Sequence, residues 1–203
     1  MKCGPRGTEL NELGESIAKE QLVLQGKLKE REHLTVGCTP LSEEMLLQAL
    51  NMVDPQGQAQ LVISEDRHNV TEFQAGMLDL VVLDDPLYAY EVDGELEEVG
   101  RDSLLHFRHG KEYARYRFGP QRLGFQYLDS LGEDYEVVRT YSSLPALLRS
   151  GYSHFVSESL LVRKGQLPRG AERSLPYSVM CLYRSGVAGT DGLLKALRPS
   201  EPR

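Results

Sequence analysis

Hydroxyl, carboxylate and amide side chains recur at one kind of position in this sequence, where an apolar run gives way to a helical pattern. Such side chains can cap the helix that follows, and they can also hold a small polar ligand at the end of a strand. Capping alone remains the alternative at each position. The candidate ligand-binding residues are Thr39, Ser42, Ser64, Asp84, Gln121, Arg122, Ser142 and Ser143.

Positive charge is concentrated in residues 106–122, HFRHGKEYARYRFGPQR. Arg122 or Arg117 in this stretch suits a carboxylate, because the guanidinium group can hold both carboxylate oxygens at once. We therefore expect a small anionic ligand. An exposed basic strand face that balances nearby acids is one alternative. Aromatic residues alternating with arginine also allow single-stranded nucleic acid, although the net charge of −7 disfavours it.

No constellation for catalysis, metal binding or a cofactor emerges from the remaining polar residues. Asp84 and Asp85 are adjacent, so a strand would point them to opposite faces, and His106 and His109 would be separated in the same way. Cys38 precedes a helix, but a buried small residue is the simpler interpretation. The sequence has no phosphate-binding loop, dinucleotide fingerprint or hydrolase elbow. We assign no catalytic residue, no metal and no cofactor.

The 203 residues carry 23 basic and 30 acidic side chains and three cysteines without a CxxC pair. This composition is globular, and it excludes a disulfide scaffold and a protein that coats nucleic acid with its whole surface. No apolar run approaches the roughly 18 residues of a membrane span, and no signal peptide is visible. We expect a cytoplasmic protein without a membrane partner.

Strand and helix patterns alternate along the chain, which predicts an α/β fold with parallel strands. Residues 87–118 are expected to be extended, with a hairpin turn at Asp93-Gly94. The predicted strands are 33–37, 59–64, 78–83, 135–141, 152–163 and 176–183. The predicted helices are 41–53, 70–77, 121–131, 144–150 and 190–197.

The chain leaves one α/β unit, builds a second and returns to the first. We expect lobe I to comprise 33–90 with 170–203, and lobe II to comprise 91–169. Two crossings between lobes leave a single cleft with hinge strands behind it, and strand-end residues would line that cleft. Before the lobes, residues 8–31 carry a narrow apolar stripe typical of a long helix that needs a packing partner. Packing on its own domain is one interpretation, and a dimerising or linker helix is the other.

Three segments resemble the effector-binding domain of LysR-type transcription regulators, which has the type II periplasmic-binding-protein fold. They are HLTVGCTPLSEEML (33–46), EFQAGMLDLVVLDDP (72–86) and GYSHFVSESLLVRKG (151–165). The stretch GPRGTELNELGESIAKEQ (4–21) is similar to the wing and linker helix of LysR-type and ModE-like regulators. The resemblance implies residues 1–32 as a wing remnant and linker helix, a homodimer through that helix, and DNA binding only if the missing helix-turn-helix is supplied.

Two functions follow from these observations. The first is a sensor domain, from a truncated regulator or a stand-alone protein, that binds a small anionic metabolite. The second is an enzyme on the same fold, a lyase or dehydratase acting on a carboxylate metabolite. The sensor is favoured because no acid–base pair or nucleophile constellation emerges.

Overall fold

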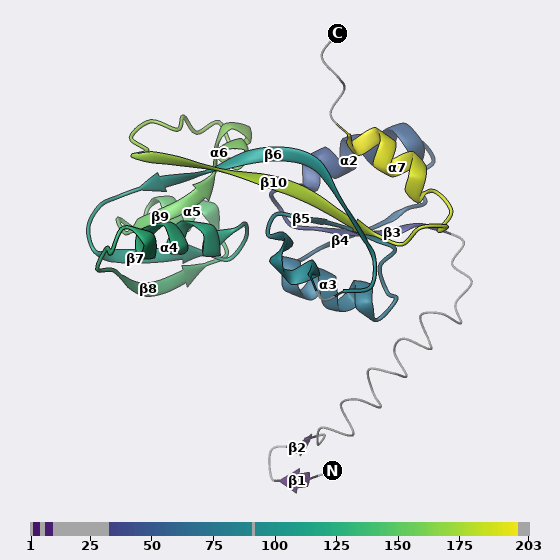
Figure 1. The fold of residues 1–203 in the computed structure, drawn as a ribbon, viewed down its shortest axis with the longest axis horizontal. Helices are drawn as coiled ribbons and strands as arrows, with labels where there is room; N and C mark the ends of the chain where they lie inside the picture. Colours follow the sequence, from purple (N-terminus) through teal and green to yellow (C-terminus); the bar gives the residue numbers. More distant parts are fainter. Residues whose placement is uncertain (1, 5–6, 10–32, 91, 199–203) are drawn as a thin grey trace.

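The computed structural model describes residues 2–4, 7–9, 33–90 and 92–198 (Figure 1). Two short antiparallel strands, β1 (Lys2–Gly4) and β2 (Gly7–Glu9), pair near the N-terminus. The predicted helix over 8–31 lies outside the described residues from position 10 onward, and so does the dimer expected through it. Within the described ranges, no helix is both long and apolar enough to cross a membrane.

Lobe I is built on three parallel strands that run side by side in the order β4-β3-β5. In β5, Leu80 and Val82 face helices α2 and α7, whereas Val81 and Leu83 face α3 on the other side (Figure 1). This double coverage explains why β5 is apolar at every position. The elements of the lobe are β3 (Thr35–Cys38), α2 (Glu43–Val53), β4 (Gln60–Ile63), α3 (Asp66–Gln74), β5 (Leu80–Leu83), the 3₁₀ turn η1 (Pro86–Ala89) and α7 (Thr190–Leu197).

Lobe II repeats this plan with the parallel strands β9, β7 and β8. Helix α4 packs Phe125 and Leu128 on one face of the sheet, and α5 and α6 cover the other. The elements of the lobe are β7 (Glu112–Tyr116), α4 (Gln121–Ser130), β8 (Glu136–Tyr141), α5 (Leu144–Leu148), β9 (Ser153–Ser157) and α6 (Glu158–Arg163).

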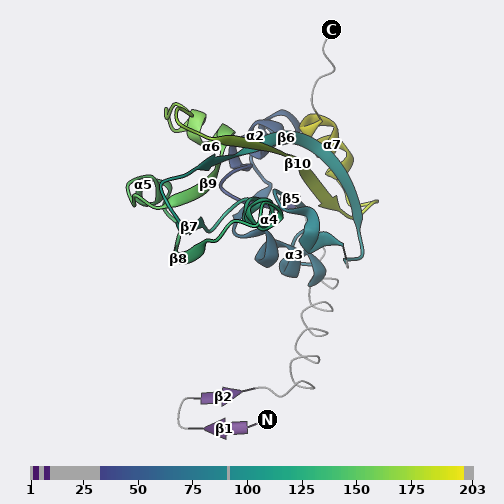
Figure 2. The same ribbon diagram turned by 60° about the vertical axis from the view of Figure 1, so that its left-hand side comes forward.

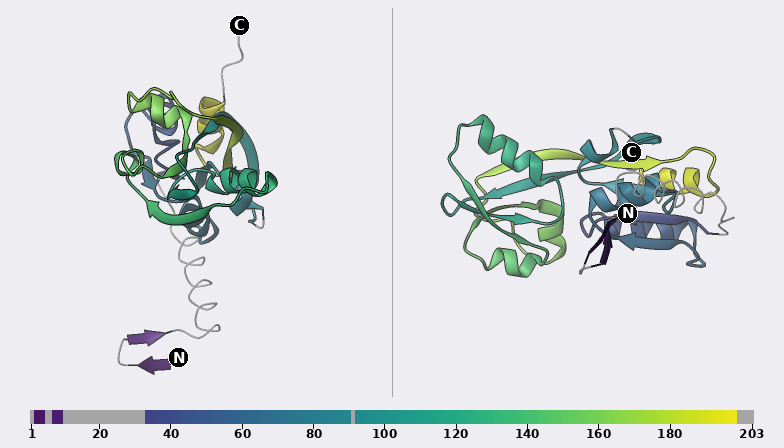
Figure 3. Two further views of the ribbon diagram at one scale, coloured as in Figure 1. Left: turned by 90° about the vertical axis from the view of Figure 1, so that its left-hand side faces the viewer. Right: turned by 90° about the horizontal axis from the view of Figure 1, so that it is seen from below.

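Two long antiparallel strands, β6 (Glu95–Phe107) and β10 (Arg173–Tyr183), cross from one lobe to the other (Figures 1 and 3). The lobe I end of β10 pairs with β5, and the lobe II end of β6 pairs with β9. Hydrogen bonds therefore join all eight strands into one sheet, β4-β3-β5-β10-β6-β9-β7-β8, although the helices and cores belong to two lobes. Figure 2 shows the lobes from the side of lobe II, with α4 in front.

Four of the predicted elements are wrong in kind or extent. The extended stretch expected from residue 87 begins later, because Pro86–Ala89 form the 3₁₀ turn η1. The chain makes no hairpin at Asp93-Gly94, because β6 pairs with β10 instead of a preceding strand. Gly94 serves close packing there, since a Cβ atom would lie 2.9 Å from Leu182 Cδ1. The predicted strand 152–163 ends at Ser157, whose side chain accepts a hydrogen bond from Leu160 N and so caps helix α6. Helix α3 begins at residue 66 instead of 70.

Candidate functional site

The carboxyl ends of the parallel strands of the two lobes meet at the interlobe contact. Arg122, in the first turn of α4, reaches Asp85 after β5, with Nη2 2.9 Å from Oδ1 and Nε 3.3 Å from Oδ2. Arg117, just after β7, forms an ion pair with Glu65 after β4. Both arginines belong to lobe II and both carboxylates to lobe I. The lobes are therefore joined by two arginine–carboxylate pairs at their strand ends.

A cavity of about 630 Å³ lies beside these two ion pairs. Its wall includes Asp85 and Glu65 from lobe I and Arg117, Arg122 and Arg115 from lobe II. Both ion-paired arginines are partly exposed. Arg122 contacts both carboxylate oxygens of Asp85, whereas Arg117 contacts Oε1 of Glu65 with both Nε and Nη2.

Gln121 lines the same cavity, but its amide group mainly supports the backbone of lobe II. Its Oε1 accepts a hydrogen bond from Tyr116 N at 3.2 Å, and its Nε2 donates to Phe155 O at 3.2 Å. The side chain is buried, and these bonds fix the turn between β7 and α4. Gln121 thus positions the start of α4, where Arg122 stands.

A second cavity of about 310 Å³ lies against the bridging strands, where Gly100 and Val179 form part of its wall. Ser42 and Asp84 line it from lobe I. Thr39 Oγ1 donates to Asp84 Oδ2 across the ends of β3 and β5, and Thr39 also caps the following turn through Leu41 N. Burial raises the pKa of Asp84 to about 7, against the lowering effect of the Thr39 hydrogen bond. Three of the predicted residues therefore come together here.

Asp102 on β6 is a polar residue of the second cavity that the sequence analysis missed. Its carboxylate accepts hydrogen bonds from Ser157 Oγ at 2.6 Å, Ser159 Oγ at 2.7 Å and Tyr177 Oη at 2.9 Å. Ser103 N and Ser159 N add two backbone donors. Apart from Ser103 N on β6 itself, these donors come from β9, α6 and β10, so only the pairing of the bridging strands could have revealed the cluster.

Asp66, also missed, organises the loop that carries the candidate residue Asp84 and its neighbour Asp85. It lies in the first turn of α3 and is buried, and its carboxylate accepts hydrogen bonds from Asp84 N and, at 2.8 Å, from Asp85 N. Burial is the largest cause that raises the pKa of Asp66, and the charge of Asp84 adds to it. Asp66 therefore holds Asp84 toward one cavity and Asp85 toward the other.

Leu41 is an interlobe contact beside both cavities. It belongs to lobe I in sequence, yet it packs in the hydrophobic core of lobe II with Leu105, Tyr116 and Leu160. It lines the second cavity and lies against Gly119, which lines the first. Both cavities therefore lie beside this leucine, between the lobes where the sequence predicted a cleft.

Ser64, Ser142 and Ser143 line neither cavity. The backbone N–H of Ser64 donates to Cys38 O at 2.9 Å, and Asn69 Nδ2 donates to the carbonyl oxygen of Ser64. Ser142 and Ser143 are exposed after β8, and Ser143 makes no side-chain cap of α5. Their role in ligand binding stays a prediction.

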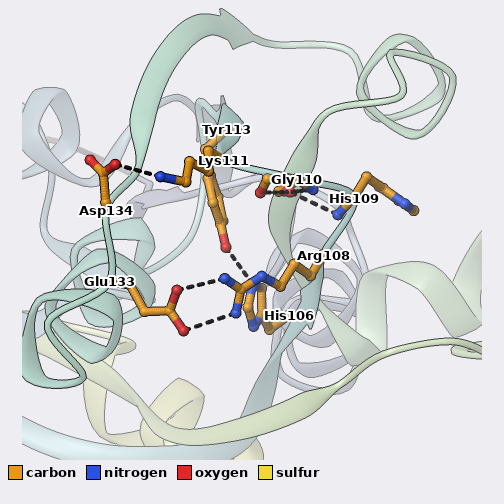
Figure 4. A network of polar contacts seen from close by, with 9 residues as sticks. His106, Arg108, His109, Gly110, Lys111, Tyr113, Glu133 and Asp134 are labelled. Atoms are coloured by element: carbon orange, nitrogen blue, oxygen red, sulfur yellow. Dashed lines mark hydrogen bonds and ion pairs between the residues drawn. The ribbon is translucent and has the colours of Figure 1, made fainter.

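Two further basic residues of the stretch, Arg108 and Lys111, are paired with acids at the far end of lobe II (Figure 4). Arg108 holds Glu133 with both guanidinium nitrogens, and Lys111 Nζ lies 2.7 Å from Asp134 Oδ2. His106 Nε2 lies 2.9 Å from Tyr113 Oη, inside the lobe. This end of the stretch therefore fits the predicted alternative of a basic face balanced by acids.

The other chemistries considered for the described part of the chain are metal binding and a reactive cysteine thiol. No group of three or more His, Cys, Asp or Glu side chains gathers there in a way that could hold a metal ion. Cys38 is buried, and burial raises the pKa of its thiol to about 12, so the thiolate needed for reactivity is disfavoured.

Comparison with known structures identifies the fold. The regulatory domain of HypT from Salmonella typhimurium superposes with a TM-score of 0.65 at 9% identity, covering 84% of this chain and 96% of that one. The CcmR regulatory domain from Synechocystis, in complex with 2-PG, gives 0.61 at 15% identity, covering 84% and 99%. Full-length LysG from Corynebacterium glutamicum, a LysR-type regulator with bound effector Arg, gives 0.55 at 19%, covering 94% and 81%.

Neither the protein-family profiles nor the curated protein sequences include a match to this chain. The structural likeness establishes that residues 33–198 have the two-lobed fold of LysR-type regulatory domains, as the sequence segments predicted. At these identities it establishes the fold alone.

Proposed function

We propose that the chain is the ligand-sensing part of a cytoplasmic LysR-type regulator, and that it binds a small anionic metabolite in the larger cavity. One observation carries the proposal. Arg122 and Arg117 from lobe II each hold a carboxylate of lobe I, Asp85 and Glu65, at the wall of an open cavity between the lobes. A ligand carboxylate presents the same chemistry to the same guanidinium groups.

Binding of such a ligand would be coupled to the arrangement of the lobes. Asp85 and Glu65 act as internal ligands that hold the lobes together through Arg122 and Arg117. An anion that takes over either arginine removes an interlobe ion pair and adds contacts of its own. The ligand then shifts the equilibrium between lobe arrangements toward the arrangement that it binds more tightly. The size of the shift is set by the difference between its affinities for the arrangements.

The fold supports this proposal because proteins that share it contain small molecules. The CcmR regulatory domain was solved with 2-PG, and LysG was solved with Arg as its effector. These ligands belong to those proteins. For this chain they favour a small-molecule sensor over the lyase or dehydratase, for which the two cavities offer no paired acid and base in hydrogen-bonding contact.

A thermal-shift screen with small carboxylates, phosphate and sulfate tests the proposal. We expect at least one carboxylate to raise the melting temperature, and Arg122→Gln to abolish that rise. Arg198→Gln is the matched control, because Arg198 is an exposed arginine with an ion pair to Glu97 away from both cavities. An equal loss in both variants, or a rise that Arg122→Gln leaves unchanged, argues against the site. Conversion of the carboxylate by the purified protein would favour the enzyme.

Two further proposals concern partners other than the ligand, namely DNA and a second copy of the chain. Both involve residues 1–32. DNA binding would require a helix-turn-helix in addition to the described lobes. A homodimer through residues 8–31 predicts that deletion of residues 1–31 leaves a folded monomer. Analytical ultracentrifugation and thermal melts of the full chain and the deletion decide this, and a deletion that unfolds would assign the segment to the core.

A further inference from the structure

We propose that the smaller cavity against the bridging strands binds the ammonium group of a small organic amine. Asp84 and Ser42 would accept its hydrogen bonds, and Asp102 would add negative charge. The inference rests on the proposed function only in that both cavities lie between the same lobes. The larger cavity would take the anion, whereas this one would take a cation.

Two carboxyl groups at this cavity, those of Asp84 and Asp102, have no basic partner among the described residues. Asp84 is only 1% exposed, and neither it nor Asp102 has a basic side chain within ion-pair distance in the described part of the chain. Arg101 in the wall pairs with Glu98 at 2.7 Å. Buried carboxylates are stable as anions only with a counter-charge or several donors.

Arg163, the other basic residue of the wall, is directed elsewhere. Its guanidinium group donates to Leu41 O and lies 3.8 Å from Glu44. Arg163 acts on Asp84 only from beyond ion-pair distance. Asp102 accepts its hydrogen bonds from hydroxyl and backbone donors, none of which is a cation. A positive charge in the cavity would therefore meet two carboxyl groups that lack a cationic partner, and it would favour the ionised form of Asp84.

The wall of this cavity also contains Ser42, whose hydroxyl has no hydrogen-bond partner. Ser42 is 4% exposed, and its Oγ makes no hydrogen bond in the described part of the chain. A buried hydroxyl without a partner costs free energy, so a ligand donor that reaches this oxygen would gain a hydrogen bond. The Asp84 carboxylate already accepts from Thr39 through Oδ2. An ammonium group has three N–H donors, and both the carboxylate and the hydroxyl can accept from it.

The remainder of the cavity wall is partly apolar. Leu41, Met45 and Val179 give the cavity an apolar side that suits a short alkyl chain. The volume of about 310 Å³ fits a small organic molecule. Because the described residues contain no cluster of three metal-type ligands, the donor set favours an organic cation over a metal ion. A primary amine on a short alkyl chain matches both sides of the cavity.

Isothermal titration calorimetry of the full chain with n-butylamine and n-butanol at neutral pH tests the inference. We expect saturable binding of the amine, which is then charged, and none of the alcohol. Ser42→Ala and Asp84→Asn should each weaken amine binding about tenfold or more. Ser42→Ala should leave the fold intact, because the lost hydroxyl bonds to nothing in the protein. Asp134→Asn is the control, since Asp134 is an exposed carboxylate in lobe II.

Three results would overturn the inference: no binding of the amine, equal binding of the alcohol, or amine binding that Ser42→Ala leaves unchanged. Thermal melts of every variant accompany the titrations, and Ser42→Ala decides the question if Asp84→Asn unfolds. Carboxylate binding and its dependence on Arg122 are measured on the same samples. Failure of the amine alone therefore overturns this inference, and failure of the carboxylate alone overturns the proposed function.

Discussion

Replacing Leu41 by alanine tests the claim that this side chain joins the two lobes. Leu41 precedes helix α2, and its side chain is 5% exposed within the hydrophobic core of lobe II. Leucine-to-alanine changes in cores cost about 2–5 kcal/mol, and less where the surroundings can collapse. Because the lobes can approach each other, we expect a loss of about 2–3 kcal/mol.

Two leucines in the following helix, α2, calibrate the loss of stability expected for Leu41→Ala. Leu46 is fully buried inside lobe I, so Leu46→Ala should cost more than Leu41→Ala. Leu47 is 40% exposed, so Leu47→Ala should cost less than about 1 kcal/mol. Urea unfolding followed by circular dichroism measures all three variants. A cost for Leu41→Ala as small as that for Leu47→Ala would refute the role of Leu41 as an interlobe contact.

Three further predictions use the same interlobe region. Burial raises the pKa of Asp84 from its ordinary 3.8 to about 7, so the folded state keeps a proton that the unfolded chain loses. The free energy of unfolding should therefore fall as pH rises from about 4 to 7, and Asp84→Asn should flatten this dependence in melts across that range. Gly119→Ala should cost at least about 1 kcal/mol in urea unfolding, because Gly119 has φ +82° and a Cβ would lie 2.9 Å from Leu41 Cδ2; a neutral result contradicts the close contact. A double-mutant cycle of Arg122→Gln and Asp85→Asn should give a coupling near 1 kcal/mol that decreases in high salt, and zero coupling would show that the pair does not hold the lobes together.

Local sequence patterns predict much of the fold. Each signal lies in or next to the element that it predicts. A continuous apolar run predicts β5, and turn residues at its two ends predict α2. Ser157 shows where this approach stops. A strand that ends and a helix that begins at one serine look like a longer strand, because only Ser157, Glu158 and Ser159 separate two apolar groups, and none of them is a glycine or proline.

The pairing of β6 with β10 could not be predicted from local patterns. Its partners, such as Tyr177 opposite Asp102, lie far apart in the chain and meet only once both lobes exist. Asp102 therefore gave no signal as a site residue. Thr39, Ser42 and Asp84 were predictable as a group because parallel strands bring their carboxyl ends to one edge. The packing of Leu41 against lobe II was equally unpredictable, because its partners there lie far from it in the sequence.

The most direct test of the proposed sensor is a nuclear magnetic resonance titration that follows the arginine Nε–Hε groups. The Nε atoms of Arg122 and Arg117 donate to Asp85 and Glu65 across the interlobe contact. With a panel of small carboxylates, phosphate and sulfate, we predict saturable shifts at these two resonances for at least one anion. The Nε–Hε of Arg198, which donates to Glu97 away from the cavities, should stay in place. No saturable shift at Arg122 or Arg117 with any of these anions would contradict the account.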